Sequence, residues 1–256
     1  MYLHHQFDHV FEGSPPPTIS FLVCSLPRSG SSLLCDVLAS TELAGAPTEF
    51  FDPNHIDALA RIWGAHGLDE YLRALLARKT SRNGVFGFKA HYHQIKNTFG
   101  DRDLREVFPK LRFVYITRRD RVRQAVSFAR AMRTEQWAAH QPARFEPGPF
   151  DAAAIGDALE WIEREEALWE ELFANMRESP HRLDYEDLVH DVEGSVLAVM
   201  RFLGIELPDG LRVPSPTLER QSDSLSEQWV RRYLATRSGP PSARPGPSPG
   251  RRSAPG

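Results

Sequence analysis

One segment near the start of the chain constrains the fold most, because it joins a strand, a loop and a helix without interruption. Residues 18–25 (TISFLVCS) form a nearly continuous apolar run, which is typical of a strand covered on both faces. Residues 26–32 (LPRSGSS) are turn-forming, and residues 33–38 (LLCDVL) begin a helical pattern. This order of elements predicts the first unit of an α/β protein.

The same alternation of strand and helix continues along the chain. The pattern predicts strands at 85–90, 111–117 and 181–183, and helices over 121–137, 151–177 and 194–203. Such alternation indicates a parallel sheet with helices on both faces, so we expect a three-layer α/β/α fold with a central parallel sheet. We expect an N-terminal extension over 1–17, one domain over 18–237, and a disordered Pro/Gly/Ser/Arg tail over 238–256.

Charge and composition exclude several classes of protein. The chain has 31 Lys and Arg against 34 Asp and Glu, a balance of −3, so it lacks the basic field that a duplex nucleic acid would require. No apolar run approaches the ~20 residues of a membrane span. Residues 1–10 lack the basic and apolar segments of a signal peptide, and the two cysteines, Cys24 and Cys35, have apolar neighbours typical of buried thiols. We therefore expect a cytoplasmic protein.

The loop after the first strand has the chemistry of an anion site. Gly30 lets a ligand approach the backbone closely, and Arg28 adds a fixed positive charge. Hydroxyl donors come from Ser29, Ser31 and Ser32, and the following helix start offers unpaired N–H groups. The loop is not a Walker A motif, which is longer and carries Lys before the hydroxyl. The residues alone leave an ordinary capped βα turn as an equal alternative.

A second candidate anion site follows the strand expected at 111–117. Arg119 lies where this strand ends, and Ser127 lies about two helical turns beyond Asp120, so we expect both side chains to face the same way. An Arg fork and a Ser hydroxyl can bind one phosphate together. Taken alone, the site has an alternative interpretation as the basic, solvated face of a helix.

Two separated anion sites indicate a nucleotide with two phosphate groups, and the chain resembles the mycobacterial-type trehalose 2-sulfotransferase family. The resemblance covers about residues 18–237 and rests on FLVCSLPRSGSSLLCDVL, GAPTEFFDP, VFGFK, QAVSFARAMRTEQW and LERQSDSLSEQWVRRY, in this order. It implies a P-loop-NTPase-like sulfotransferase fold and 3′-phosphoadenosine 5′-phosphosulfate (PAPS) as co-substrate, with no metal. It also implies a homodimer and a sugar or glycolipid acceptor, namely trehalose at its 2-position or a related glucoside.

The resemblance also assigns roles to individual residues. It implies that residues 28–32 hold the 5′-phosphosulfate and that Arg119 and Ser127 hold the 3′-phosphate. Glu49 matches the proposed general base of the family. Arg28 cannot realistically donate a proton, so we assign it stabilisation of the transferring group's charge.

Two further cations match positions of the family. Lys89 lies at the end of a predicted strand, where it can reach the reacting groups, and we assign it a catalytic role. Arg220 lies in a late segment that we expect to cover the nucleotide. Without the family, each would be an ordinary surface cation.

The resemblance places acceptor contacts mainly around Glu49. The expected substrate-binding residues are Pro27, Ala46, Pro47, Thr48, Glu49, Phe50, Phe51, Asp52 and Trp63. Pro27 and Ala46 stand where the family carries polar side chains, which weakens the case for trehalose because buried sugar hydroxyls need partners. The aromatic neighbours of Glu49 are expected to exclude water and raise its pKa.

Two alternatives remain open, and a third pattern does not indicate a metal site. A Mg²⁺-dependent kinase would share the fold, but the chain lacks the GK[ST] sequence. A non-catalytic nucleotide-binding scaffold would keep the loop without turnover. His91 and His93 have the spacing of two metal ligands on one strand face, but no third ligand is evident, so we expect no metal site.

Overall fold

The computed structural model describes residues 7–137, 141–216 and 223–237. The predicted tail over 238–256 and the predicted role of Arg220 lie outside these residues. The four strands follow the apolar runs of the sequence: β1 (Ile19–Cys24), β2 (Val85–Ala90), β3 (Leu111–Thr117) and β4 (His181–Asp184).

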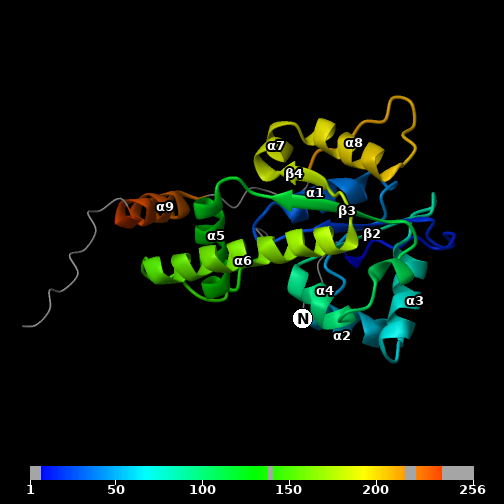
Figure 1. Cartoon of the computed structure of the whole chain (residues 1–256), viewed down its shortest axis with the longest axis horizontal. Coiled ribbons are helices and arrows are strands. Elements are labelled where there is room, and N and C mark those ends of the chain that lie inside the picture. Colours follow the sequence, from blue (N-terminus) through cyan, green and yellow to red (C-terminus); the bar gives the residue numbers. More distant parts are fainter. Residues whose placement is uncertain (1–6, 138–140, 217–222, 238–256) are drawn as a thin grey trace, which may run out of the picture.

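The strands form one parallel sheet in the order β2-β1-β3-β4, so the chain crosses over between neighbouring strands (Figure 1). All three pairings are parallel, as the alternating pattern predicts. Cys24 is in register with both Ala90 and Tyr115. The segments that follow β1, β2 and β3 therefore leave the sheet together at the carboxyl ends of the strands, where α/β proteins bind their ligands.

Nine α-helices within the described residues connect and cover the strands. They are α1 (Ser31–Ser40), α2 (Pro53–Trp63), α3 (Leu68–Lys79), α4 (Tyr92–Phe99), α5 (Arg121–Thr134), α6 (Ala152–Met176), α7 (Tyr185–His190), α8 (Val192–Leu203) and α9 (Ser224–Arg237). The sequence pattern did not predict α2, α3, α4, α7 and α9. The start of α2 carried a readable signal, because Asp52 caps it and Pro53 occupies its first turn.

Apolar side chains of the sheet divide between two cores, as the period of two along a strand requires. Leu22 and Phe88 lie in one core, which contains residues of α2, α3, α4, α5, α6 and α9. Phe21 and Val114 lie in the other, with residues of α1, α7 and α8. This arrangement confirms the three-layer α/β/α fold. In Figure 1, α5, α9 and one end of α6 extend together beyond the sheet.

Residues 7–11 pack onto the domain through a buried lysine. Phe7 and Phe11 are buried, and Lys79 at the end of α3 is completely buried. The Lys79 ammonium donates to the backbone carbonyl of Phe7 at 2.6 Å and to that of His9. Burial lowers the pKa of Lys79 to about 8. The Phe7 ring also packs against Phe50, so this segment supports the turn that carries Glu49.

Gly87 in the middle of β2 provides a test of sheet packing. A Cβ there would lie 2.4 Å from the Phe21 ring and 3.0 Å from the Ala44 carbonyl oxygen. We expect Gly87→Ala to lower the free energy of unfolding by about 3 kcal/mol, because overpacking in a dense core displaces its neighbours. Urea unfolding measures the change.

The matched control is Gly156→Ala in α6, where the new Cβ would lie 3.7 Å from the Tyr233 hydroxyl, an ordinary contact. Here the higher helix propensity of Ala should raise stability by up to about 1 kcal/mol. An unfolding midpoint of Gly87→Ala equal to the wild-type value would contradict the packing described for β2.

Candidate active site

The loop between β1 and α1 folds as a tight, largely buried turn. Ser29 is completely buried and Ser31 is 5% exposed. Gly30 caps α1 with φ of +89°, a conformation that favours glycine, and the Tyr185 ring lies directly against it. A Cβ at Gly30 would be 2.4 Å from Cδ2 of Tyr185. The structure therefore requires glycine here for two independent reasons.

Two arginines lie together at this loop. Arg28 donates from Nε to the Ser127 hydroxyl at 2.8 Å and from a terminal nitrogen to the Trp137 carbonyl at 2.7 Å. Arg118 donates to the backbone carbonyl of Arg28 at 3.3 Å, and its guanidinium lies 4.6 Å from the centre of the Tyr185 ring. Ser127, predicted to bind a phosphate, thus lies beside the first loop.

The electrostatics of this cluster favour an anion. Burial, and then the charge of Arg118, lower the pKa of Arg28 to about 10. Burial also lowers the pKa of Arg118. Among the described residues, the Ser29 hydroxyl and the Nε atoms of Arg118 and Arg130 are buried without a hydrogen-bond partner. An oxyanion would relieve the repulsion and accept from such donors.

Arg119 has other partners in the structure. It is exposed, and its guanidinium pairs with Asp184 at 3.0 Å and with Asp187 at 2.7 Å. Its neighbour Arg118 contacts the loop instead. Successive side chains leaving an extended strand point to opposite sides, so only one member of an Arg-Arg pair can face the loop. Binding of a phosphate by Arg119 and Ser127 together stays a prediction.

Lys89 connects Glu49 to the loop. The Lys89 ammonium is 2.7 Å from Oε1 of Glu49 and donates to the Ser32 hydroxyl at 2.9 Å. The Gln94 side chain donates to Oε2 of Glu49 at 3.1 Å, and Nε2 of His91 is 3.8 Å from the same oxygen. One buried cation thus connects the predicted base, the loop and the start of α1.

The expectation that the aromatic neighbours raise the pKa of Glu49 is wrong. Burial alone would raise the pKa, but the charge of Lys89 and the hydrogen bonds from Lys89 and Gln94 hold it well below its ordinary value. Phe50 and Phe51 are completely buried in the core. They support the turn, while the cation beside Glu49 decides its ionisation.

The predicted acceptor residues divide by exposure. Five are buried: Ala46, Pro47, Thr48, Phe50 and Phe51. Four are partly exposed: Pro27, Glu49, Asp52 and Trp63. Trp63 stacks on Tyr71, whose hydroxyl donates to the Phe50 carbonyl at 2.7 Å. Contact of these residues with an acceptor stays a prediction.

Four residues that contact the loop or Glu49 were not predicted from the sequence to do so: Arg118, Tyr185, His91 and Gln94. A signal existed for the last two, because His91 directly follows β2 and Gln94 lies in the first turn of α4, and the carboxyl end of β2 lies beside that of β1. Gln94 is 2% exposed, and its carbonyl oxygen accepts from the His91 backbone at 2.9 Å. The contacts of His91 and Gln94 with Glu49 form only because the fold brings the turn at Glu49, which is distant in the sequence, next to the end of β2.

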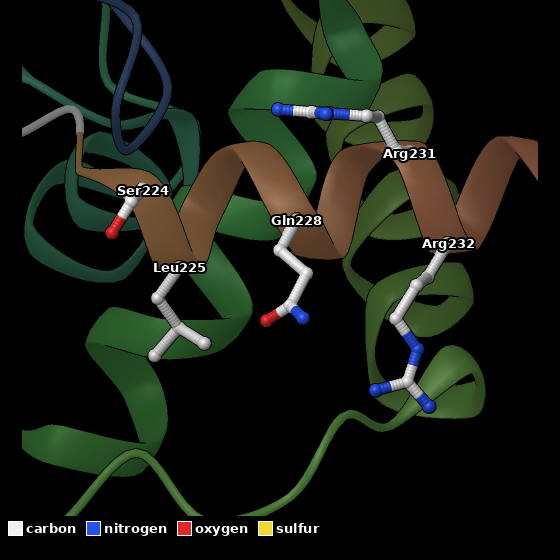
Figure 2. A pocket seen from close by; sticks show the side chains of 5 residues that line it. All are labelled: Ser224, Leu225, Gln228, Arg231 and Arg232. Atoms are coloured by element: carbon white, nitrogen blue, oxygen red, sulfur yellow. The ribbon is translucent and has the colours of Figure 1, made fainter.

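Other features of the described residues contribute no chemistry to this site. A hollow of about 520 Å³ on α9 is lined by Ser224, Leu225, Gln228, Arg231 and Arg232 (Figure 2). It contains no carboxylate or imidazole that could accept a proton. Within the described ranges, no cluster of three or more His, Cys, Asp and Glu side chains is arranged to hold a metal. No helix in these ranges is long and apolar enough to span a bilayer.

Comparison with known proteins gives concordant matches. The family model of the Stf0 sulphotransferases matches residues 20–236. The trehalose 2-sulfotransferase of Mycolicibacterium smegmatis is 31% identical over 259 residues, covering 86% of this chain and 96% of that protein. The trehalose 2-sulfotransferase of Mycobacterium tuberculosis is 31% identical over 256 residues, covering 84% and 94%.

Among solved structures, the chain is distantly similar to retinol dehydratase in complex with retinol and PAP. The identity is 16%, the match covers 91% of this chain and 67% of that one, and the TM-score is 0.37. The order and the parallel pairing of the strands in this chain, and not this match, define its fold.

Proposed function

The chain belongs to the Stf0 sulphotransferase family, and we propose that it transfers the sulfuryl group of PAPS to a carbohydrate hydroxyl. The proposed acceptor is the 2-position of trehalose or a related glucoside. The observation that carries the proposal is the contact of Lys89 with both Glu49 and Ser32, because it joins a proton acceptor to an anion-binding loop.

The residues around the loop fit a PAPS molecule. Arg28 and Arg118 lie together, with lowered pKa values, and buried donors of Ser29 and Arg118 lack partners within the described residues. We propose that residues 28–32 hold the 5′-phosphosulfate. Ser127 with Arg118 or Arg119 would hold the 3′-phosphate, and only Arg118 contacts the loop in the structure.

The reaction requires a group that takes the acceptor's proton and cations that stabilise the developing charge. When bound, PAPS supplies the activated sulfuryl group. Glu49 is ionised, because the charge of Lys89 lowers its pKa, and so can accept the hydroxyl proton. Lys89 and Arg28 provide positive charge at the loop, and Phe50 and Phe51 hold the turn of Glu49 in place.

Support for the acceptor comes from the relatives, both of which are named trehalose 2-sulfotransferases. Ala46 is 2% exposed and offers no polar group, so Asp52 is the proposed substitute near Glu49. Gln94 donates to both carboxylates, at 3.1 Å to Glu49 and 3.4 Å to Asp52. The proposal includes a homodimer in the cytoplasm, which size-exclusion chromatography and fractionation of cells test.

The deciding experiment is transfer from labelled PAPS to trehalose, glucose, glucosides and glycolipids, with mapping of the sulfated position. Calorimetry with adenosine 3′,5′-bisphosphate and with AMP tests the donor site separately. We expect the bisphosphate to bind at least about tenfold more tightly, since it adds a phosphate that a cation can bind. Equal affinities would contradict the donor site, and tight binding without transfer to any sugar would indicate a nucleotide-binding scaffold.

Gly30→Ala tests the loop itself. The new Cβ would meet the Tyr185 ring at 2.4 Å, and φ of +89° disfavours every residue with a side chain. We expect the affinity for adenosine 3′,5′-bisphosphate to fall at least about tenfold, because the loop must change shape. Calorimetry measures this, with Gly156→Ala as control, and unchanged affinity would show that the loop geometry does not bind the donor.

A further inference from the structure

His91 follows β2 directly and lies in the second layer of the site, behind Glu49. It is 8% exposed, and its Nδ1 lies 3.0 Å from the backbone carbonyl oxygen of Ser25 at the end of β1. A carbonyl oxygen only accepts, so the contact with Ser25 favours the neutral tautomer in which Nδ1 carries the proton. The lone pair of the neutral imidazole is therefore on Nε2.

This unprotonated nitrogen faces the predicted base. Nε2 of His91 is 3.8 Å from Oε2 of Glu49, while Oε1 of the same carboxylate is 2.7 Å from the Lys89 ammonium. The two oxygens of Glu49 thus have different surroundings. One faces a cation at the anion-binding loop, and the other faces an imidazole and the Gln94 amide.

We infer that His91 accepts from Glu49 the proton that Glu49 removes from the acceptor hydroxyl. The inference rests on the proposed function and deepens it. His91 does not touch the reacting atoms, so it acts through Glu49 as a proton relay.

The relayed proton comes from the acceptor hydroxyl during sulfuryl transfer. The hydroxyl O–H bond breaks as the new O–S bond forms and the S–O bond to the donor phosphate breaks, and that phosphate oxygen keeps the electron pair. The proton passes to Glu49 and then to Nε2 of His91. The products are a sulfate ester, adenosine 3′,5′-bisphosphate, a Glu49 carboxylate and an imidazolium.

The surroundings favour this final state. Glu49 is a weak resting place for a proton, because Lys89 lowers its pKa. Imidazoles are ordinarily about two pKa units more basic than carboxyl groups, and the charge of Glu49 raises the pKa of His91 against the effect of burial. In the imidazolium the Nδ1–H would bond to the Ser25 carbonyl, and the positive charge would form an ion pair with the Glu49 carboxylate, whose Oε2 is 3.8 Å from Nε2. A neutral His91 has no charge to pair with Glu49.

Several charged groups face His91 and set its titration. Burial lowers the pKa of His91, the charge of Glu49 raises it, and the charges of Lys89 on β2 and His93 on α4 lower it. Glu165 on α6 lies beyond His93, 3.6 Å from that ring. The relay requires His91 to start neutral, so its protonation should reduce kcat on the acid side.

The first test uses His91→Gln, whose amide can still donate to Ser25 but cannot hold the relayed proton. We expect kcat for sulfuryl transfer to fall about 10- to 100-fold, with the KM for PAPS within about twofold of wild type. The acid limb of the kcat profile should move to lower pH. His66→Gln is the matched control, because His66 is exposed in the segment between α2 and α3, and it should keep wild-type kcat.

The second test separates chemistry from support. His91→Ala should lose kcat to the same extent, and added imidazole should restore part of it by occupying the space left by the ring. A His91→Gln protein with wild-type kcat would overturn the relay. Loss of kcat in both variants with an unchanged pH profile and no rescue by imidazole would also overturn it, because that result indicates support alone.

A readout that needs no turnover separates this inference from the proposed function. Nitrogen-15 NMR of the free protein should show His91 as the Nδ1–H tautomer, with a pKa that falls in Glu49→Gln because a favourable charge is lost. An unchanged pKa would show that the two groups are uncoupled and would overturn the relay. Coupling seen by NMR in a protein that sulfates no sugar would count against the proposed function instead.

Discussion

Replacing Glu49 by Gln is expected to lower kcat for sulfuryl transfer by about 10³-fold, within the range found for loss of a general base. The amide keeps the shape of the side chain but cannot take the hydroxyl proton. Affinity for adenosine 3′,5′-bisphosphate should stay within about twofold, because Arg28 and the loop serines are untouched. Rates from labelled PAPS, together with calorimetry, measure both quantities.

This substitution also affects stability, so folding must be checked alongside turnover. Lys89 has a side chain only 5% exposed, and in Glu49→Gln it loses its carboxylate partner at 2.7 Å. We expect a loss of about 3 kcal/mol, as for other buried charges that lose a partner. Thermal unfolding measures it, and Glu12→Gln, at an exposed carboxylate, is the control for both assays.

The stability difference between wild type and Glu49→Gln should itself depend on pH. Glu49 has a lower pKa in the folded state than its ordinary value, so its ionisation stabilises the fold above about pH 4. The contribution is lost as pH falls through the folded-state pKa. Wild-type kcat in a folded Glu49→Gln protein would remove Glu49 as the base.

The parts of the fold that sequence alone could predict are those where one local pattern decides the structure. The apolar runs at 85–90 and 111–117 form β2 and β3 with the predicted bounds. A strand buried on both faces is an almost continuous apolar run, so its ends can be located in the sequence. The helices α2 and α3 were missed because the chain between α1 and β2 mixes turn residues with short amphipathic segments, and α4, which follows β2, has only 8 residues. Tertiary packing, rather than a strong local pattern, stabilises such helices.

At the site, residue types were predictable but their partners were not. The motif around Glu49 indicated a base, yet its ionisation depends on Lys89, which reaches it from a strand forty residues further along. Arg119 was predicted to bind a phosphate, but in the structure Arg118 contacts the loop and Arg119 pairs with Asp184 and Asp187. Asp184 ends β4 and Asp187 lies in α7, so only the pairing of β4 with β3 brings these acids to Arg119.

Replacing Lys89 by Met is expected to change both the rate and the pH at which Glu49 works. Met fills a similar volume without charge, so the loop loses its bond to Ser32 and Glu49 loses its nearest cation. We expect kcat/KM at neutral pH to fall at least about 10²-fold, because a cation at the site of developing charge is removed.

The direction of the pH effect follows from the two influences on Glu49. Burial raises its pKa and the charge of Lys89 is the largest opposing influence, so without Lys89 the effect of burial is offset less and the pKa rises. The acid limb of kcat/KM reports the essential base of the free enzyme, so it should move to higher pH by at least about one unit. Removing Lys89 also raises the pKa of His91, which moves the limb in the same direction.

This shift distinguishes two explanations of a slow variant. If Lys89 only held the loop in shape, Lys89→Met would reduce the rate equally at every pH, and the acid limb would stay where it is. Lys96→Met on α4 is the control, because Lys96 pairs with Asp101 away from the loop and its loss should leave rate and profile unchanged. A slow Lys89→Met enzyme with an unmoved acid limb would therefore mean that the ion pair with Glu49 does not govern the base during turnover.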